Sequence, residues 1–140
     1  MCAALGPQLQ DARETLFFVQ NRLFRAGYDI STMPQEGKVP TALQEDDTKR
    51  LEREIDKLQA DLPPLQHFVL PGGCPVAAQL QYARTVARRA ERRVVALAPE
   101  LDVNPEVVRF INRLSDLLFV MARHVNQTLG GDEQPVDWLV

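Results

Sequence analysis

The segment PEVVRFINRLSDLLFVMARHVNQ, residues 105–127, predicts a long helix that is apolar around most of its circumference. Its apolar residues recur at intervals of three and four, the spacing that places side chains on one face of a helix. That face consists of Val107, Ile111, Leu114, Leu118, Met121 and Val125. Further apolar surface comes from Phe110, Leu117, Phe119 and Val120. Such a helix is buried, or packs against both its own bundle and another subunit, so we expect an oligomer.

Two helical patterns precede this segment. Residues 8–26 carry an apolar stripe and end before Gly27, a residue type that suits a C-terminal cap. Residues 46–62 place leucine and isoleucine on one stripe with charged side chains elsewhere, which is typical of a surface helix. Pro63 stops this second helix, because proline lacks the backbone N–H that a helix needs.

Two start signals define the remaining helices. Pro75 suits the first position of a helix over residues 75–97. Asn104 suits an N-terminal cap, and Pro105 after it suits the first position of the helix that ends near residue 127. No segment shows the alternation typical of strands. The sequence therefore predicts an all-α fold, a helical bundle with four long helices.

The connections are polar or short. Residues 27–47 form a long polar stretch that we expect to be mobile, since connections of this length are uncommon in compact domains. Residues 65–73 are expected to be extended and to end in a turn at the Pro-Gly-Gly sequence. We place the bundle in residues 1–129 and a C-terminal tail in residues 130–140. The tail has little reason to be ordered unless Trp138 and Leu139 dock against the bundle.

Composition excludes several classes of protein. The chain has 140 residues, a net charge of −3 and 45% hydrophobic residues, which predicts one soluble domain. It has no stretch long enough to span a membrane and no signal-peptide pattern at its start. Two cysteines favour a reducing cytosol over a disulfide scaffold, and two isolated histidines argue against a structural zinc site. The acidic balance argues against nucleic-acid binding, and an arginine-rich helix that binds RNA is a third hypothesis.

The helix over 75–97 concentrates positive charge, with five arginines within residues 83–95. On a helical wheel its core stripe consists of Ala83, Val86, Ala87, Ala90, Val94 and Leu97. One flank carries Arg84, Arg88 and Arg92 with Glu91 beside them, and the other carries Arg89 and Arg93. A solvated basic face is one explanation. Another is an anion site, because only arginine offers a planar, bidentate fork, and Glu91 can orient an arginine of its own flank.

A polar row interrupts the apolar helix 105–127. Asn112, Asp116 and Arg123 lie close together on the helical wheel, and buried polar groups need partners. An internal salt bridge of Asp116 with Arg123, or with an arginine of the preceding helix, would explain the row. Phe119 projects beside it and would add a flat aromatic surface. Together the two helices predict an anion site against an apolar wall.

Two long motifs resemble a known family. FVLPGGCPVAAQLQYARTVARRAERRVVAL, followed by FINRLSDLLFVMARHVN, is similar to the ATP:cob(I)alamin adenosyltransferases of the propanediol-utilisation type. The family pattern reads F-I/V-L-P-G/S-G, then A-R-A/T-V-x-R-R-A-E-R, then F/Y-I/L-N-R-L-S-D-x-L-F. VQNRLFRAGYDIS resembles a third family segment, with Arg22 in place of its usual acid. The similarity extends from about residue 8 to residue 127.

The resemblance implies a reaction and its site. Members of the family are trimeric helical bundles that transfer the 5′-deoxyadenosyl group of ATP to the cobalt of cob(I)alamin and release triphosphate. The resemblance implies that Phe68 and Phe119 face the corrin ring, with Phe68 on its lower axial side. ATP, accompanied by Mg²⁺, would contact Arg88, Arg89, Glu91, Arg92 and Asn112, of which Arg88 and Asn112 are the catalytic candidates. Arg84 and Asp116 would serve structural or intersubunit contacts.

The implied surroundings are cytoplasmic. A homotrimer is the expected assembly, and a reductase and an adenosylcobalamin-dependent enzyme are the expected transient partners. No metal ligand is expected from the protein, and neither a nucleic acid nor a membrane is an expected partner.

One departure from the family pattern opens an alternative. The family begins with a glycine-rich T-K-x-G-D-x-G-x-T segment that wraps the ATP phosphates, followed by a helix with V-D-E-L-N, and this sequence has neither. Either the sequence starts late, or the protein is a divergent member. The alternative function is therefore a non-catalytic corrinoid-binding or scaffold protein that keeps the bundle and Phe68.

Overall fold

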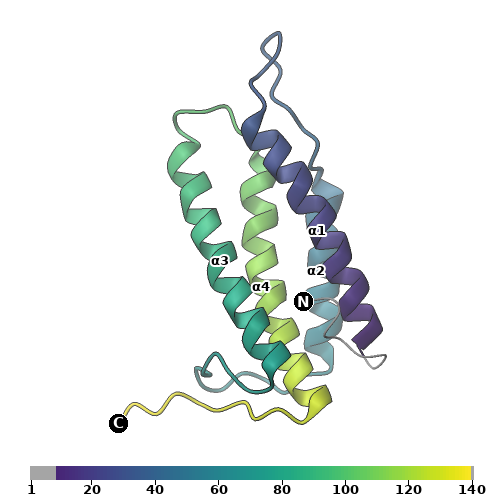
Figure 1. Ribbon diagram of the computed structural model, residues 1–140, viewed down its shortest axis with the longest axis vertical. Helices are drawn as coiled ribbons and strands as arrows, with labels where there is room; N and C mark the ends of the chain where they lie inside the picture. Colours follow the sequence, from purple (N-terminus) through teal and green to yellow (C-terminus); the bar gives the residue numbers. More distant parts are fainter. Residues whose placement is uncertain (1–8, 140) are drawn as a thin grey trace.

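The computed structural model describes residues 9–139 and contains four helices that alternate in direction (Figure 1). They are α1 (Gln10–Ser31), α2 (Glu45–Ala60), α3 (Pro75–Leu97) and α4 (Pro105–Leu129). Apart from two isolated β-bridges, Gln35 with Lys38 and Val69 with Pro135, the described residues contain no strand pairing. The all-α bundle predicted from the sequence is confirmed. Within residues 9–139, each helix is too short or too polar to cross a bilayer.

Helix α4 is the centre of the bundle. It packs extensively against α3 and α2, and more narrowly against α1. Phe110, Leu117 and Val120, which extend its apolar surface beyond one face, are all buried within this single chain. Each such side chain contributes about 1.5–3 kcal/mol when it leaves water. The apolar circumference of α4 is therefore covered largely within this chain, and the oligomer expected from it stays a prediction that needs other support.

The ends of α3 and α4 lie where the sequence places them, or close by. Pro75 begins α3, and Asn104 caps α4 because its side chain accepts a hydrogen bond from the Glu106 amide at 3.0 Å. Helix α4 continues two residues past residue 127 and ends at Gly130, whose φ of 67° is the left-handed conformation that glycine adopts at low cost.

The predicted end of α1 is wrong. Gly27 lies inside the helix, exposed and with helical φ, and α1 continues to Ser31. A glycine within a helix costs about 1 kcal/mol relative to alanine, which neighbouring contacts can offset. Here Ala26 and Asp29 are buried on either side of Gly27. These contacts hold the last turn in helical form.

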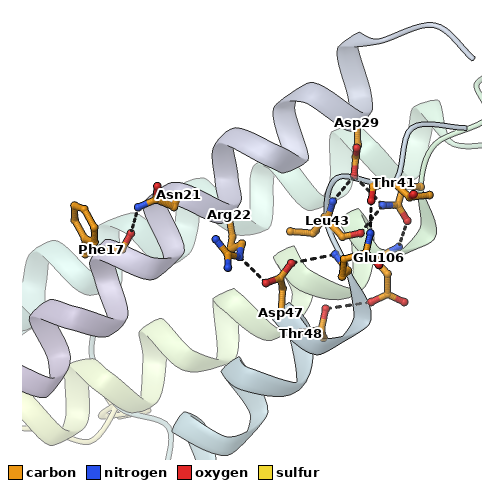
Figure 2. Close-up of polar contacts among 11 residues, drawn as sticks. Phe17, Asn21, Arg22, Asp29, Thr41, Leu43, Asp47, Thr48 and Glu106 are labelled. Atoms are coloured by element: carbon orange, nitrogen blue, oxygen red, sulfur yellow. Dashed lines mark hydrogen bonds and ion pairs between the residues drawn. The ribbon is translucent and has the colours of Figure 1, made fainter.

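Asp29 joins α1 to the start of α4 (Figure 2). Its carboxylate is 1% exposed and accepts hydrogen bonds from the amides of Ala42 at 2.7 Å and Leu43 at 2.9 Å. The side-chain amide of Asn104 donates a third bond at 2.8 Å, and a further one to the Leu43 carbonyl at 2.9 Å. A buried carboxylate is stable only with such partners. The connection expected to be mobile is therefore tied to the core over its final residues.

A second carboxylate organises the start of α2. Asp47 accepts a hydrogen bond from the Gln44 amide at 3.0 Å, which completes the cap of the helix, and pairs with Arg22 of α1 at 2.5 Å (Figure 2). Outside this cluster, Lys49 lowers the pKa of the exposed Glu45 carboxyl through a hydrogen bond and charge attraction. Because negative charge is favourable at a helix start, the carboxylates of Glu45 and Asp47 both suit the first turn of α2.

The C-terminal tail is held against the bundle, contrary to expectation. The amide of Leu70 donates to the Gln134 carbonyl at 2.8 Å, and the amide of Val136 donates to the Phe68 carbonyl at 2.8 Å. Trp138 and Leu139 do not supply the attachment by burial, since they are 77% and 97% exposed. Backbone pairing, a signal that side-chain patterns do not carry, orders the tail.

An apolar groove of about 570 Å³ separates α1 from α3, with α4 as its floor. Ile111, Leu114 and Leu118 line the floor, and Leu16, Val19, Leu23, Ala83, Val86, Ala87 and Ala90 line the walls. The predicted core stripe of α3 is therefore only partly correct. Ala87 and Val94 are buried, whereas Val86, Ala90 and Leu97 are exposed. Val86 and Ala90 line the groove, where none of the four described helices covers them.

The Asp29 junction makes a prediction about stability. Asp29→Asn keeps the size of the side chain but turns an acceptor into a donor that faces three N–H groups. We expect the free energy of unfolding to fall by about 2–4 kcal/mol, measured by urea denaturation. Asp56→Asn on the exposed face of α2 is the matched control and should change it by less than about 0.5 kcal/mol. Equal stabilities of the two variants would contradict the role given to Asp29.

Candidate functional site

A polar hollow of about 470 Å³ lies between one flank of α3 and the first half of α4. Its lining consists of Arg88, Glu91, Arg92, Val95, Ala96 and Asn112. The α3 members lie three and four residues apart, so the helix places them on one side. Four residues of the predicted ATP site, Arg88, Glu91, Arg92 and Asn112, are therefore brought together. The fifth, Arg89, is exposed and does not line this hollow.

Asn112 links the two helices at the floor of the hollow. Its side-chain nitrogen donates to Glu91 Oε1 at 2.8 Å, and its side-chain oxygen accepts from Arg113 Nη2 at 2.8 Å. Both ends of the amide are thus fixed. Glu91 was expected to orient an arginine of its own flank, but among residues 9–139 it forms no ion pair with an arginine of α3. Asn112 competes for this carboxylate from the facing helix.

The arginines at the mouth of the hollow carry unneutralised charge. Arg88 and Arg92 are exposed, and in the part of the chain that the structure describes neither forms an ion pair. Two guanidinium groups one helical turn apart repel each other in the free protein, and an anion with several oxygens would relieve that repulsion. The hollow can therefore hold a polyanion by charge-assisted hydrogen bonds.

The polar row of α4 does not act as one unit. Asp116 pairs with Arg113, three residues before it, at 3.4 Å, while Arg123 pairs with Glu133 of the tail at 3.1 Å. The internal salt bridge expected for Asp116 therefore exists with a different arginine. Arg113 takes this position because the i,i+3 spacing lies on the same face of the helix. Asp116 remains half exposed and free to accept another partner.

Phe119 contributes an aromatic face beside α3. It is partly buried against the core, and the Arg84 guanidinium carbon lies 5.1 Å from the centre of its ring. This distance is typical of a cation–π contact. Arg84 thus has its own partner and stands apart from the pair at the polar hollow.

The connection between α2 and α3 lies at the end of the bundle where α4 finishes (Figure 1), and Phe68 belongs to this connection. Its side chain is 73% exposed, and its ring meets that of Trp138 edge to face, with centroids 6.1 Å apart. An exposed phenylalanine at the rim of a bundle is available for an apolar ligand. The sequence did not predict Trp138 as a site residue, because the pattern of the tail does not indicate that its backbone pairs with the Phe68 segment.

Asn126 supports the Phe68 segment, and the sequence analysis also missed it. Its side chain accepts from the Cys74 amide at 2.9 Å and donates to the Gly72 carbonyl at 3.1 Å. A Cβ atom at Gly73 or Gly131 would collide with this side chain. The two Gly-Gly pairs of the sequence are the signal that could have indicated such a close approach. Among residues 9–139, His, Cys, Asp and Glu side chains form no group of three suited to a metal ion.

The family model described as "Cobalamin adenosyltransferase" matches residues 1–125. The chain belongs to this family. A corrinoid adenosyltransferase of Bacillus subtilis is 40% identical over 124 residues, which cover 89% of this chain and 63% of that protein. A corrinoid adenosyltransferase of mouse is 46% identical over 94 residues, which cover 67% of this chain and 40% of that protein. The chain thus spans less than two thirds of the length of these relatives.

Solved structures agree with this membership of the adenosyltransferase family. A phenylalanine-to-alanine variant of a PduO-type ATP:corrinoid adenosyltransferase from Lactobacillus reuteri, complexed with cobalamin and ATP, matches with a TM-score of 0.89 at 34% identity. The match covers 96% of this chain and 75% of that one. An arginine-to-lysine variant of the same enzyme, complexed with ATP, matches with a TM-score of 0.87, over 97% of this chain and 77% of that one.

Proposed function

We propose that this protein is an ATP:corrinoid adenosyltransferase. In the reaction, the electron pair of cob(I)alamin attacks C5′ of ATP, the cobalt–carbon bond forms, and the C5′–oxygen bond breaks. Triphosphate leaves with the bonding electrons. The observation that carries the proposal is the hollow shared by Arg88, Glu91, Arg92 and Asn112. There, two arginines that form no ion pair within residues 9–139 face a fixed Glu91–Asn112 pair.

The residues of the hollow suit the nucleotide. Arg88 and Arg92 would bind triphosphate oxygens and stabilise the charge that develops as the leaving group departs. The Glu91–Asn112 pair, already fixed by its hydrogen bond, would hold hydroxyl or amine groups of the nucleoside. Arg89, on the other flank, would reach ATP only from outside this hollow. Mg²⁺ would arrive with the nucleotide. The Lactobacillus reuteri structures complexed with ATP support this assignment.

The aromatic residues suit the corrinoid. Phe68, largely exposed at the bundle end, would cover the lower axial side of the corrin ring and displace the base that ligates cobalt there. Cobalt without this ligand is easier to reduce to the nucleophilic Co(I) state, and an apolar ring also keeps water away. Phe119 would form an apolar wall of the same site, with Arg84 holding its ring.

We further propose a homotrimer in the cytoplasm, served by a reductase and supplying an adenosylcobalamin-dependent enzyme. The support for oligomerisation is now the outer face of α1, where Phe17, Phe24 and Tyr28 are 65%, 87% and 55% exposed. Arg84 and Asp116 would contribute to contacts between subunits, as the half-exposed carboxylate of Asp116 allows.

The arginine pair provides the main test. Arg88→Lys and Arg92→Lys keep the charge but lose the bidentate fork, so we expect the ATP affinity measured by calorimetry to fall roughly ten-fold or more. Arg93→Lys, on the opposite flank of the same helix, is the matched control and should behave like the parent. If all three variants bind ATP as the parent does, the arginines form a solvated basic face. Corrinoid binding without adenosyl transfer by the parent would support the non-catalytic alternative.

Phe68 makes a prediction about corrinoid choice. Phe68→Ala should lower the transfer rate on base-ligated cobalamin more than on cobinamide, because cobinamide has no lower base to displace. The ratio of the two losses, measured as kcat/KM, should be roughly ten-fold or more, equivalent to about 1.4 kcal/mol. Equal losses on both corrinoids would show that Phe68 only packs.

The assembly is tested by light scattering at tens of micromolar. We expect the mass of a trimer, and we expect Phe24→Glu on the exposed face of α1 to shift the protein toward smaller species, since a buried unpaired charge is costly. Asp56→Asn, an exposed change on α2, should leave the mass unchanged. A parent that is monomeric at this concentration would contradict the trimer.

A further inference from the structure

The tail after α4 runs antiparallel to the segment that carries Phe68. Two backbone hydrogen bonds join them, from Leu70 to Gln134 and from Val136 to Phe68, each 2.8 Å long. The carbonyl of Phe68 itself accepts the second of these bonds. The backbone on which Phe68 stands is therefore fixed in part by the tail.

The start of the tail is anchored to α4. Arg123, whose side chain is 9% exposed, bonds both carboxylate oxygens of Glu133 through Nε at 3.1 Å and the Pro63 carbonyl through Nη2 at 3.2 Å. An ion pair with a largely buried guanidinium resists solvent competition better than a surface pair. This ion pair thus fixes the tail to the bundle at residue 133, before the tail pairs with the Phe68 segment.

Beyond the paired residues of the tail, the Trp138 ring contacts the ring of Phe68. The two rings lie at 82° with centroids 6.1 Å apart, an edge-to-face geometry. Both side chains stay largely exposed, at 73% and 77%, so burial in the core does not account for their contact. Phe68 lies outside the buried core cluster, and the Trp138 ring contacts its ring on one side.

We infer that Trp138 is a positioning residue that fixes the orientation of the Phe68 ring toward the lower axial side of the corrinoid. The inference rests on the proposed function, which gives Phe68 its place at the corrin ring. Trp138 acts through Phe68: with the tail paired to residues 68–70, the indole limits the rotation of the phenyl ring. The phenyl ring of Phe68 then contacts the corrinoid in one orientation. It therefore loses less conformational freedom when it displaces the lower base.

The test compares Trp138→Ala, Trp138→Phe and the control Leu139→Ala in the full 140-residue chain. Each variant is mixed with ATP, Mg²⁺ and either cob(II)alamin or cob(II)inamide, and electron paramagnetic resonance gives the equilibrium ratio of four- to five-coordinate Co(II). With cob(II)alamin, we expect Trp138→Ala to lower this ratio roughly two- to ten-fold, the range that an aromatic pair supports. Trp138→Phe should retain most of it, because a smaller ring still meets Phe68. Leu139→Ala, at a 97% exposed neighbour, should match the parent.

A second readout follows the tail directly. Amide hydrogen exchange at Leu70 and Val136, whose N–H groups form the two connecting bonds, should become several-fold faster in Trp138→Ala and stay unchanged in Leu139→Ala. An unchanged four-coordinate ratio in Trp138→Ala overturns the inference, as does an equal loss with cob(II)inamide, which has no base to displace. A parent that binds neither corrinoid overturns the proposed function itself, and the inference with it.

Discussion

The burial of α4 on nearly all sides is the constraint on which the structure depends. A helix with apolar residues around its circumference cannot stay in water, and α2, α3 and α1 cover it in turn. The site follows from this arrangement, because Asn112 reaches Glu91 only where α3 packs along α4. The same packing leaves α1 and α3 apart, with the apolar groove between them.

The sequence predicted the helices well where local signals and burial agree. Proline and asparagine at the starts of α3 and α4 place those helices correctly because they act within one turn. Gly27 predicted the end of α1 wrongly, because the helix continues past it to Ser31. The buried Asp29 carboxylate stabilises this last turn, and its partners lie 13 to 75 residues away, so a local signal cannot indicate them. The attachment of the tail could not be predicted, because backbone pairing of two short segments leaves no periodic pattern.

The sequence predicted which residues come together in the hollow, but only part of the contacts that they form. Helical spacing correctly put Arg88, Glu91 and Arg92 on one flank and Arg89 on the other. The partner of each side chain depends on which residue of the neighbouring helix packs next to it. A helical wheel describes one helix alone and cannot predict this contact. Hence Glu91 bonds Asn112, Asp116 bonds Arg113, and Arg123 turns to the tail. The roles in ATP and corrinoid binding came from resemblance, and binding measurements decide them.

The different attachments of α1 have a consequence for its dynamics. Its link to α2 depends on long charged side chains, namely the pairs of Lys57 with Asp11 and of Arg22 with Asp47, and the Arg50 guanidinium over the Phe18 ring. Its link to the start of α4 is the buried Asp29, near its C-terminal end. Screening by salt weakens the exposed pair of Lys57 and Asp11 far more than the buried carboxylate. Rising ionic strength should therefore loosen the N-terminal turns of α1 first, so that the helix frays from its beginning while its last turn stays in place.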